Sequence, residues 1–200
     1  FENGRFSIAG TDRGMDILDL AAHQRRRGEG ATQLDAAEIA AISLHTFPNG
    51  CHMAEVEIDP ETGSLDVLRY IVCDDVGKAV NPMIVRGQVH GGVAQGIGQA
   101  AMEHTVYDEG SGQLLSGSFM DYTLPRAGDL PDIEVDLIEV PCASNPLGVK
   151  GAGEAGAVGS PPAVINAVVD ALRSAGAGSI DMPATPERVW KALHEAKQGA

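Results

Sequence analysis

The sequence is short of positive charge, with 14 Lys and Arg against 28 Asp and Glu, a formal net charge of −14 and a pI near 4.6. Nucleic-acid binding needs a basic face that neutralises phosphates, so this deficit excludes a general nucleic-acid binder. Cysteine is scarce as well, and the three cysteines form no C-x-x-C pair. Their spacing argues against a zinc ribbon, an iron–sulfur cluster held by this chain alone and a disulfide scaffold. Isolated cysteines favour buried thiols in a reducing compartment, which predicts a cytoplasmic location.

Other common signatures are missing too. No apolar run approaches the ~18 residues that cross a bilayer, so we expect no membrane span. The histidines include no H-x-x-x-H or H-E-x-x-H spacing, and no serine lies in a G-x-S-x-G elbow, so neither a zinc site nor the usual hydrolase is indicated. The chain opens without an initiator Met or a signal-peptide pattern, which predicts that it continues from an upstream part.

The composition is otherwise that of a folded chain, with 44% hydrophobic and 21% charged residues. Its 25 glycines and 11 prolines are more than average and indicate that some segment needs a tight backbone. Periodicity, caps and turn signals predict mixed secondary structure. The predicted helices are residues 15–27, 82–104, 160–175 and 185–193, and the predicted strands lie within 1–10 and at 52–58, 65–73, 114–119 and 133–140, with a loop at 28–35.

Two of these strands form the clearest local feature, a hairpin around a turn at residues 59–63. The second strand, 65–73, becomes apolar on both sides, which predicts a central position in the sheet. Asn81 and Pro82 supply an N-cap and a first helical residue for the next helix. We therefore expect an α+β fold, with a mixed sheet and packed helices.

The helix predicted after Asn81 contains five glycines, at positions 87, 91, 92, 96 and 98. Each costs roughly 0.8–1 kcal/mol relative to alanine in a helix interior, so something must offset the loss. Two explanations stay open on spacing alone. Another helix can pack closely against the glycines, or a bulky ligand can lie against them.

Residues 151–156, GAGEAG, satisfy the pattern G-x-G-x-x-G. The nucleotide-binding form of this motif directly follows a strand and opens a helix. Here a proline-containing loop precedes it and the next helix-start signal comes at Ser160, so we expect no Rossmann site. The remaining feature is Glu154, a carboxylate among small residues. It is either an exposed turn residue or, partly desolvated in a cleft, a general base beside a ligand.

Several segments together resemble a known family. They are residues 87–99 (GQVHGGVAQGIGQ), 117–122 (GSFMDY), 125–126 (PR) and 145–156 (NPLGVKGAGEAG). In this order they are similar to the C-terminal portion of the molybdopterin-binding large subunit of the xanthine dehydrogenase, aldehyde oxidase and carbon monoxide dehydrogenase family. The resemblance implies part of the second molybdopterin-binding domain. Residues 31–200 would be its C-terminal half, and residues 1–30 a strand, helix and linker continuing from a missing upstream part.

The resemblance also implies site residues. Gln88 matches a glutamine that contacts the molybdenum–pterin near the metal, and Glu154 matches the catalytic glutamate. As general base, Glu154 would take the proton from a water-derived oxygen that attacks the substrate carbon. The loop that runs along the cofactor matches Lys150, Gly151, Ala152 and Gly153. No residue of this chain is expected to ligate the metal.

The implied cofactor is molybdenum–molybdopterin, in its plain or cytosine dinucleotide form, with iron–sulfur and FAD groups on partner chains or modules. The implied partners are the remainder of the large subunit, iron–sulfur and flavin subunits, and a small-molecule substrate. The implied activity is hydroxylation of an aldehyde or N-heterocycle carbon, absent from this chain alone. The alternative is a non-catalytic fragment, an assembly or interaction module that keeps the fold without the cofactor.

Overall fold

The computed structural model describes residues 1–27, 37–39 and 44–198, and it divides into two compact units, Phe1–Ser43 and Leu44–Ala200. In the first unit, strands β1 (Arg5–Ser7) and β2 (Gly14–Asp16) pair antiparallel and lead into helix α1 (Ile17–Arg26). The predicted helix at 15–27 is therefore present but starts later, because residues 14–16 pair with β1. The loop predicted at 28–35 lies outside the described residues, and the domain boundary predicted at residue 30 stays a prediction.

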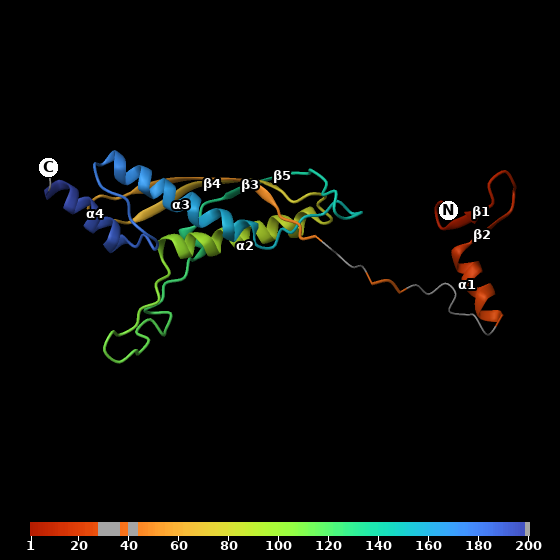
Figure 1. Ribbon diagram of the computed structural model, residues 1–200, viewed down its shortest axis with the longest axis horizontal. Helices are drawn as coiled ribbons and strands as arrows, with labels where there is room; N and C mark the ends of the chain where they lie inside the picture. Colours follow the sequence, from red (N-terminus) through yellow and green to blue (C-terminus); the bar gives the residue numbers. More distant parts are fainter. Residues whose placement is uncertain (28–36, 40–43, 199–200) are drawn as a thin grey trace. The chain divides into compact units, whose positions relative to one another are not determined.

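The second unit contains a three-stranded sheet in the order β3 (Asn49–Ile58), β4 (Leu65–Asp75) and β5 (Ile133–Ile138) (Figure 1). Strands β3 and β4 are antiparallel, while β4 and β5 are parallel. The predicted hairpin and the central position of its second strand are both confirmed. The turn forms because the Asp59 carboxylate accepts hydrogen bonds from the Glu61 N–H and the Thr62 hydroxyl.

Helices α2 (Pro82–Ala101) and α3 (Ala155–Ser174) pack against each other and cover one face of the sheet (Figure 1). Helix α4 (Pro186–Gln198) contacts α3. The core between helices and sheet is built from fully buried side chains, among them Tyr70, Val72, Val89, Val93, Ile97, Val164, Val168, Leu172 and Val189. The fold is thus α+β, with a mixed sheet and packed helices, as the sequence predicts.

The glycine-rich helix α2 begins where the sequence predicts, since the Asn81 side chain accepts from the Ile84 N–H and Pro82 is the first residue. Its glycines fall into two groups. Gly92, Gly96 and Gly98 are buried against α3 and Pro125, with no room for a methyl group. A Cβ on Gly87 or Gly91 would meet open space. Close helix packing explains the first group, and the second group leaves two exposed positions of α2 without a side chain.

The start of α3 corrects a prediction. The sequence places it at Ser160, but the helix begins at Ala155, directly after Glu154, and includes Pro161 and Pro162. Packing on α2 outweighs the lost backbone hydrogen bonds of the prolines, because the first turn of α3 lies against α2 at Gly156. Residues 151–156 therefore lead directly into a helix, contrary to the expectation. They do not directly follow a strand, because β5 ends at Ile138 and Val149 forms only an isolated bridge with Gly77.

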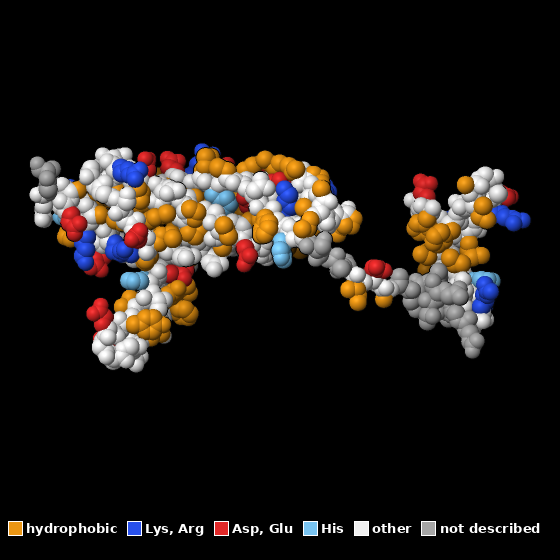
Figure 2. Space-filling view, in the orientation of Figure 1, with side chains coloured by type: hydrophobic (Ala, Val, Ile, Leu, Met, Phe, Trp, Pro, Cys, Tyr) orange, Lys and Arg blue, Asp and Glu red, His pale blue; other side chains and the backbone are white. Residues whose placement is uncertain are grey.

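The strand predicted at 114–119 is also wrong. Residues 102–126 leave the end of α2 and return before β5 as an arm (green in Figure 1), which has a single bridge, between Tyr107 and Leu114. The Asp108 carboxylate binds the N–H and hydroxyl of Ser111 and turns the chain back on itself. Figure 2 shows hydrophobic side chains on this arm, and Phe119 and Met120 are among its most exposed residues.

Helix α3 also qualifies a prediction about membranes. By length and composition alone, its 20 residues are apolar enough to cross a bilayer. The count of consecutive apolar residues missed it because Ser160, Asn166 and Asp170 interrupt the run. Val164, Val168 and Leu172 are fully buried in the core, which is the behaviour of an internal helix of a folded domain.

Candidate functional site

A pocket of about 620 Å³ lies between the start of β3, the end of β4 and the first turn of α3. The residues that line it are Thr46, Phe47, Pro48, Asn49, Gly50, His52, Asp74, Gly151, Ala152, Gly153, Glu154, Ala155, Val158 and Gly159. Four residues of the predicted site, Gly151 to Glu154, therefore form one wall. Within the described residues, no group of three or more His, Cys, Asp or Glu side chains is placed to hold a metal ion.

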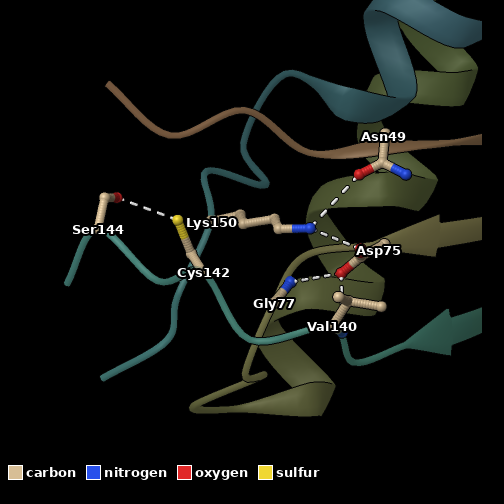
Figure 3. A network of polar contacts seen from close by, with 7 residues as sticks. All are labelled: Asn49, Asp75, Gly77, Val140, Cys142, Ser144 and Lys150. Carbon is tan, nitrogen blue, oxygen red and sulfur yellow. Dashed lines mark hydrogen bonds and ion pairs between the residues drawn. The ribbon is translucent and has the colours of Figure 1, made fainter. Parts of the chain in front are cut away.

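The loop that leads to this wall is fixed to the sheet (Figure 3). Lys150 Nζ lies 2.5 Å from Asp75 Oδ2 and 3.4 Å from Asn49 Oδ1. The Lys150 N–H donates to the Val76 carbonyl, and the Lys78 N–H donates to Gly148, so the backbone is paired as well. The predicted cofactor residue Lys150 is therefore an anchor of the loop in this chain, with its ammonium committed to Asp75.

Asp75, the partner of Lys150, is itself held by the backbone. Its Oδ2 faces Lys150, while its Oδ1 accepts the N–H groups of Gly77 at 2.8 Å and Val140 at 3.1 Å. The Lys150 ammonium first, and then these N–H groups, hold the pKa of Asp75 below its ordinary value, although its burial opposes the shift. Nearby, Cys142 Sγ lies 3.0 Å from the Ser144 hydroxyl, which lowers the pKa of the thiol.

Glu154 stands at the N-cap of α3, and its carbonyl accepts the Val158 N–H. Its side chain makes no capping hydrogen bond and is exposed, so the carboxylate is free to act on a neighbouring molecule. The backbone N–H groups of Gly151, Ala152 and Gly153 donate to no other residue that the structure describes. They remain available to an anionic or polar ligand.

Gln88 comes to the same place from another element. It is exposed on the first half of α2, and its Oε1 would lie 3.7 Å from a Cβ built on Gly153. The packing of α2 on α3 thus brings Gln88 beside the loop that ends in Glu154. Gly87 precedes Gln88 and Gly91 follows it by three residues, and neither has an atom near its missing Cβ. The structure brings all the predicted site residues into one region.

Sequence reasoning missed a buried group that includes two residues lining this pocket, His52 and Asp74. His52 Nδ1 lies 2.9 Å from the Tyr70 hydroxyl, and its Nε2 lies 3.3 Å from Asp74 Oδ1. Burial raises the pKa of Tyr70 far above its ordinary value, and the nearby carboxylate of Asp74 adds to the rise. The alternation of β3 carried the signal, since His52 is in phase with the inward residues Ala54 and Val56.

Comparison with known proteins places the chain in a family. The family model of the molybdopterin cofactor-binding domain matches residues 1–131. The chain belongs to this family. It is 38% identical over 199 residues to the carbon monoxide dehydrogenase large chain of Hydrogenophaga pseudoflava, a match covering 98% of this chain and 24% of the relative. It is 44% identical over 146 residues to the nicotine 6-hydroxylase large subunit of Paenarthrobacter nicotinovorans, covering 73% of this chain and 18% of the relative.

The fold agrees with a solved member of the family. A crystal structure of Cu,Mo-CO dehydrogenase superposes with a TM-score of 0.88 at 33% identity, covering 100% of this chain and 25% of that one. The resemblance to molybdopterin-binding large subunits is therefore confirmed. The chain spans about a quarter or less of the length of these relatives.

The residues present suit a cofactor of this class. A Cβ on Gly87 or Gly91 would meet open space, and Gly151 lines the 620 Å³ pocket, so these positions leave room for a large ligand. Free backbone N–H groups and the N-terminus of α3 suit its anionic parts. The Gln88 amide offers both a donor and an acceptor at the edge of this wall.

Proposed function

We propose that this chain forms one wall of a molybdenum–pterin site in an oxidoreductase that hydroxylates an aldehyde or N-heterocycle carbon with oxygen from water. The observation that carries the proposal is the meeting of Gln88 with the loop that ends in Glu154, with Gly153 between them. Membership of the family supports the cofactor class. The likeness to a nicotine 6-hydroxylase subunit supports an N-heterocycle as substrate.

When bound, the molybdenum–pterin supplies the two-electron redox chemistry of such a hydroxylation. In this proposal the amide of Gln88 and the backbone of Gly151, Ala152 and Gly153 hold the cofactor. Lys150 keeps the loop in place through Asp75. Glu154 is the general base, because its carboxylate makes no capping hydrogen bond, lines the pocket and stands at the positive end of α3. It accepts the proton that the water-derived oxygen loses as it attacks the substrate carbon.

Further partners belong to the same proposal. The remainder of the large subunit would close the open side of the pocket, and iron–sulfur and flavin modules would carry the electrons onward. Glu154 is exposed in this chain, as expected if a further segment covers it in the complete enzyme. A cytoplasmic location and the cytosine dinucleotide form of the pterin stay predictions.

The test is the variant Glu154→Gln in the reconstituted complete enzyme. Loss of a general base should lower turnover at least about a hundredfold while molybdenum content stays near wild type. Glu195→Gln is the control, because Glu195 is an exposed residue of α4 and its loss should leave both quantities unchanged. Turnover retained in Glu154→Gln would remove Glu154 from this role.

The exposure of Glu154 also favours a second candidate, a module that keeps the fold for assembly without the cofactor. Isolation of the protein from its host, followed by metal analysis, separates the two. Molybdenum together with a complementary chain supports the enzyme. A chain isolated alone and free of molybdenum supports the module.

A further inference from the structure

Strand β4 ends in two acidic residues with opposite surroundings. Asp75 is fully engaged by Lys150 and two backbone N–H groups. The Asp74 side chain is 4% exposed, and its Oδ1 lies 3.3 Å from His52 Nε2. Its Oδ2 is buried and has no hydrogen-bond partner in the part of the chain that the structure describes. Buried carboxylate oxygens are nearly always paired, so this oxygen indicates a donor that comes from elsewhere.

His52 cannot be that donor. Its Nδ1 faces the Tyr70 hydroxyl and its Nε2 faces Asp74 Oδ1, so even the doubly protonated ring leaves Oδ2 without a partner. The ring also packs directly on the backbone of Gly159, where a Cβ would lie 2.6 Å from it. This contact holds the ring in place. Asp74 packs on the backbone of Gly50 in the same way, because its carboxylate occupies the space that a Gly50 side chain would need.

The two buried residues reach the pocket. Asp74 and His52 both line the 620 Å³ space whose other wall is the loop ending in Glu154. This volume is typical of sites for small organic molecules. The pocket therefore combines apolar and backbone surfaces, such as Phe47 and Val158, with one incompletely paired carboxylate among its lining residues.

We propose that Asp74, backed by His52 and Tyr70, is a subsite that binds an N–H donor group of a small molecule lying in the pocket. A cationic donor such as an amidinium or a protonated ring nitrogen fits best, because hydrogen bonds between opposite charges are the stronger ones. Its use in catalysis rests on the proposed function: a molecule held at Asp74 by its nitrogen extends within the same pocket towards Glu154.

Other charges near the subsite do not replace the donor. Lys150 is directed to Asp75 on the neighbouring position of β4, and Tyr70 is a phenol whose raised pKa keeps it neutral. Glu154 is the other acidic side chain of the pocket. Because the whole chain carries a net charge of −14, cations also collect on it non-specifically, and a test must separate the two effects.

The test measures binding of benzamidine, a flat aromatic amidinium, to the 200-residue chain by calorimetry. Acetophenone is the matched probe, similar in shape but neutral and without N–H groups. Asp74→Asn should weaken benzamidine binding about tenfold or more and leave acetophenone binding unchanged. Asp66→Asn, on the exposed part of the same strand, removes the same charge and should leave benzamidine binding unchanged. Equal losses in both variants would show non-specific attraction and overturn the subsite.

A second measurement needs no variant. Benzamidine added to the isotope-labelled wild-type chain should shift the NMR signals of the His52 ring and the Gly50 amide. Shifts confined to exposed acidic residues, or no binding at all, would overturn the proposal. Neither experiment involves molybdenum or turnover. The subsite and the catalytic role of Glu154 can therefore fail independently.

Discussion

Gly92 of α2 and Gly156 of α3 meet backbone to backbone. A Cβ on Gly92 would lie 2.9 Å from the Gly156 Cα, and one on Gly156 would lie 3.0 Å from the Gly92 Cα. This contact holds the two helices close enough for Gln88 to lie beside Gly153. The glycines of α2 are therefore a packing device on one side of the helix, and on the other side they leave an open surface.

Adjacent glycines of α2 should respond oppositely to alanine. Gly92→Ala forces a methyl group against the backbone of α3 and should lower the free energy of unfolding by about 1–3 kcal/mol. Gly91→Ala meets open space and should raise it by roughly 0.8–1 kcal/mol through helix propensity. Urea titration of both variants measures the difference. Changes of the same sign would contradict the described packing.

Gln88→Ala should weaken cofactor retention in the complete enzyme, because it removes the only part of the Gln88 side chain that can hydrogen-bond. The expected result is a molybdenum content clearly below wild type after dialysis, with the free energy of unfolding of the chain unchanged. Gln99→Ala, three turns further along the same helix and also exposed, is the control and should keep its metal. Equal metal loading in both variants would remove Gln88 from the cofactor site.

The Lys150–Asp75 pair predicts a dependence of stability on pH. The pKa of Asp75 in the folded chain lies below its ordinary value of 3.8. The pair therefore stabilises the fold fully above the pKa of the unfolded carboxyl group, and this contribution is lost as the pH falls through the lower, folded pKa. At neutral pH Asp75→Asn should lower Tm by several degrees, and in acid the difference from wild type should shrink.

Thermal unfolding from about pH 2.5 to 7 measures this effect. Glu139→Gln is the comparison, because Glu139 forms a more exposed ion pair with Lys78 and screening by solvent makes such pairs weak. A constant difference between Asp75→Asn and wild type at every pH would mean that the carboxylate charge contributes nothing.

Features set by neighbouring residues were predictable from sequence. The β3–β4 hairpin follows from alternating side chains and an Asp-Pro turn, and the start of α2 follows from Asn81 and Pro82. Each signal acts within a few residues, so no tertiary contact is needed to interpret it.

Features set by distant contacts were not predictable. The first turn of α3 is helical because Gly156 packs on α2, although Ser160 followed by two prolines is the stronger local start signal. Apolar and polar side chains alternate too little around Leu114 and Leu115 to specify a strand, and no partner strand exists for them in the described arm. The first case is decided by a contact with a residue far away in the sequence, and the second by the lack of a partner strand.

The site was predictable only in part. Resemblance to the family indicated Gln88 and Glu154, and the helix packing explains how they come together. It did not indicate Asp74. Its missing hydrogen bond is visible only when burial of each carboxylate oxygen is known.

The segment before Glu154 is tied down by protein atoms alone, through Lys150 to Asp75 and through the Asn145 side chain, which both donates to and accepts from the Val149 backbone. These contacts set the course of the backbone up to Lys150. A ligand that binds beside Glu154 would therefore meet a fixed approach followed by three residues whose N–H groups have no partner among the described residues.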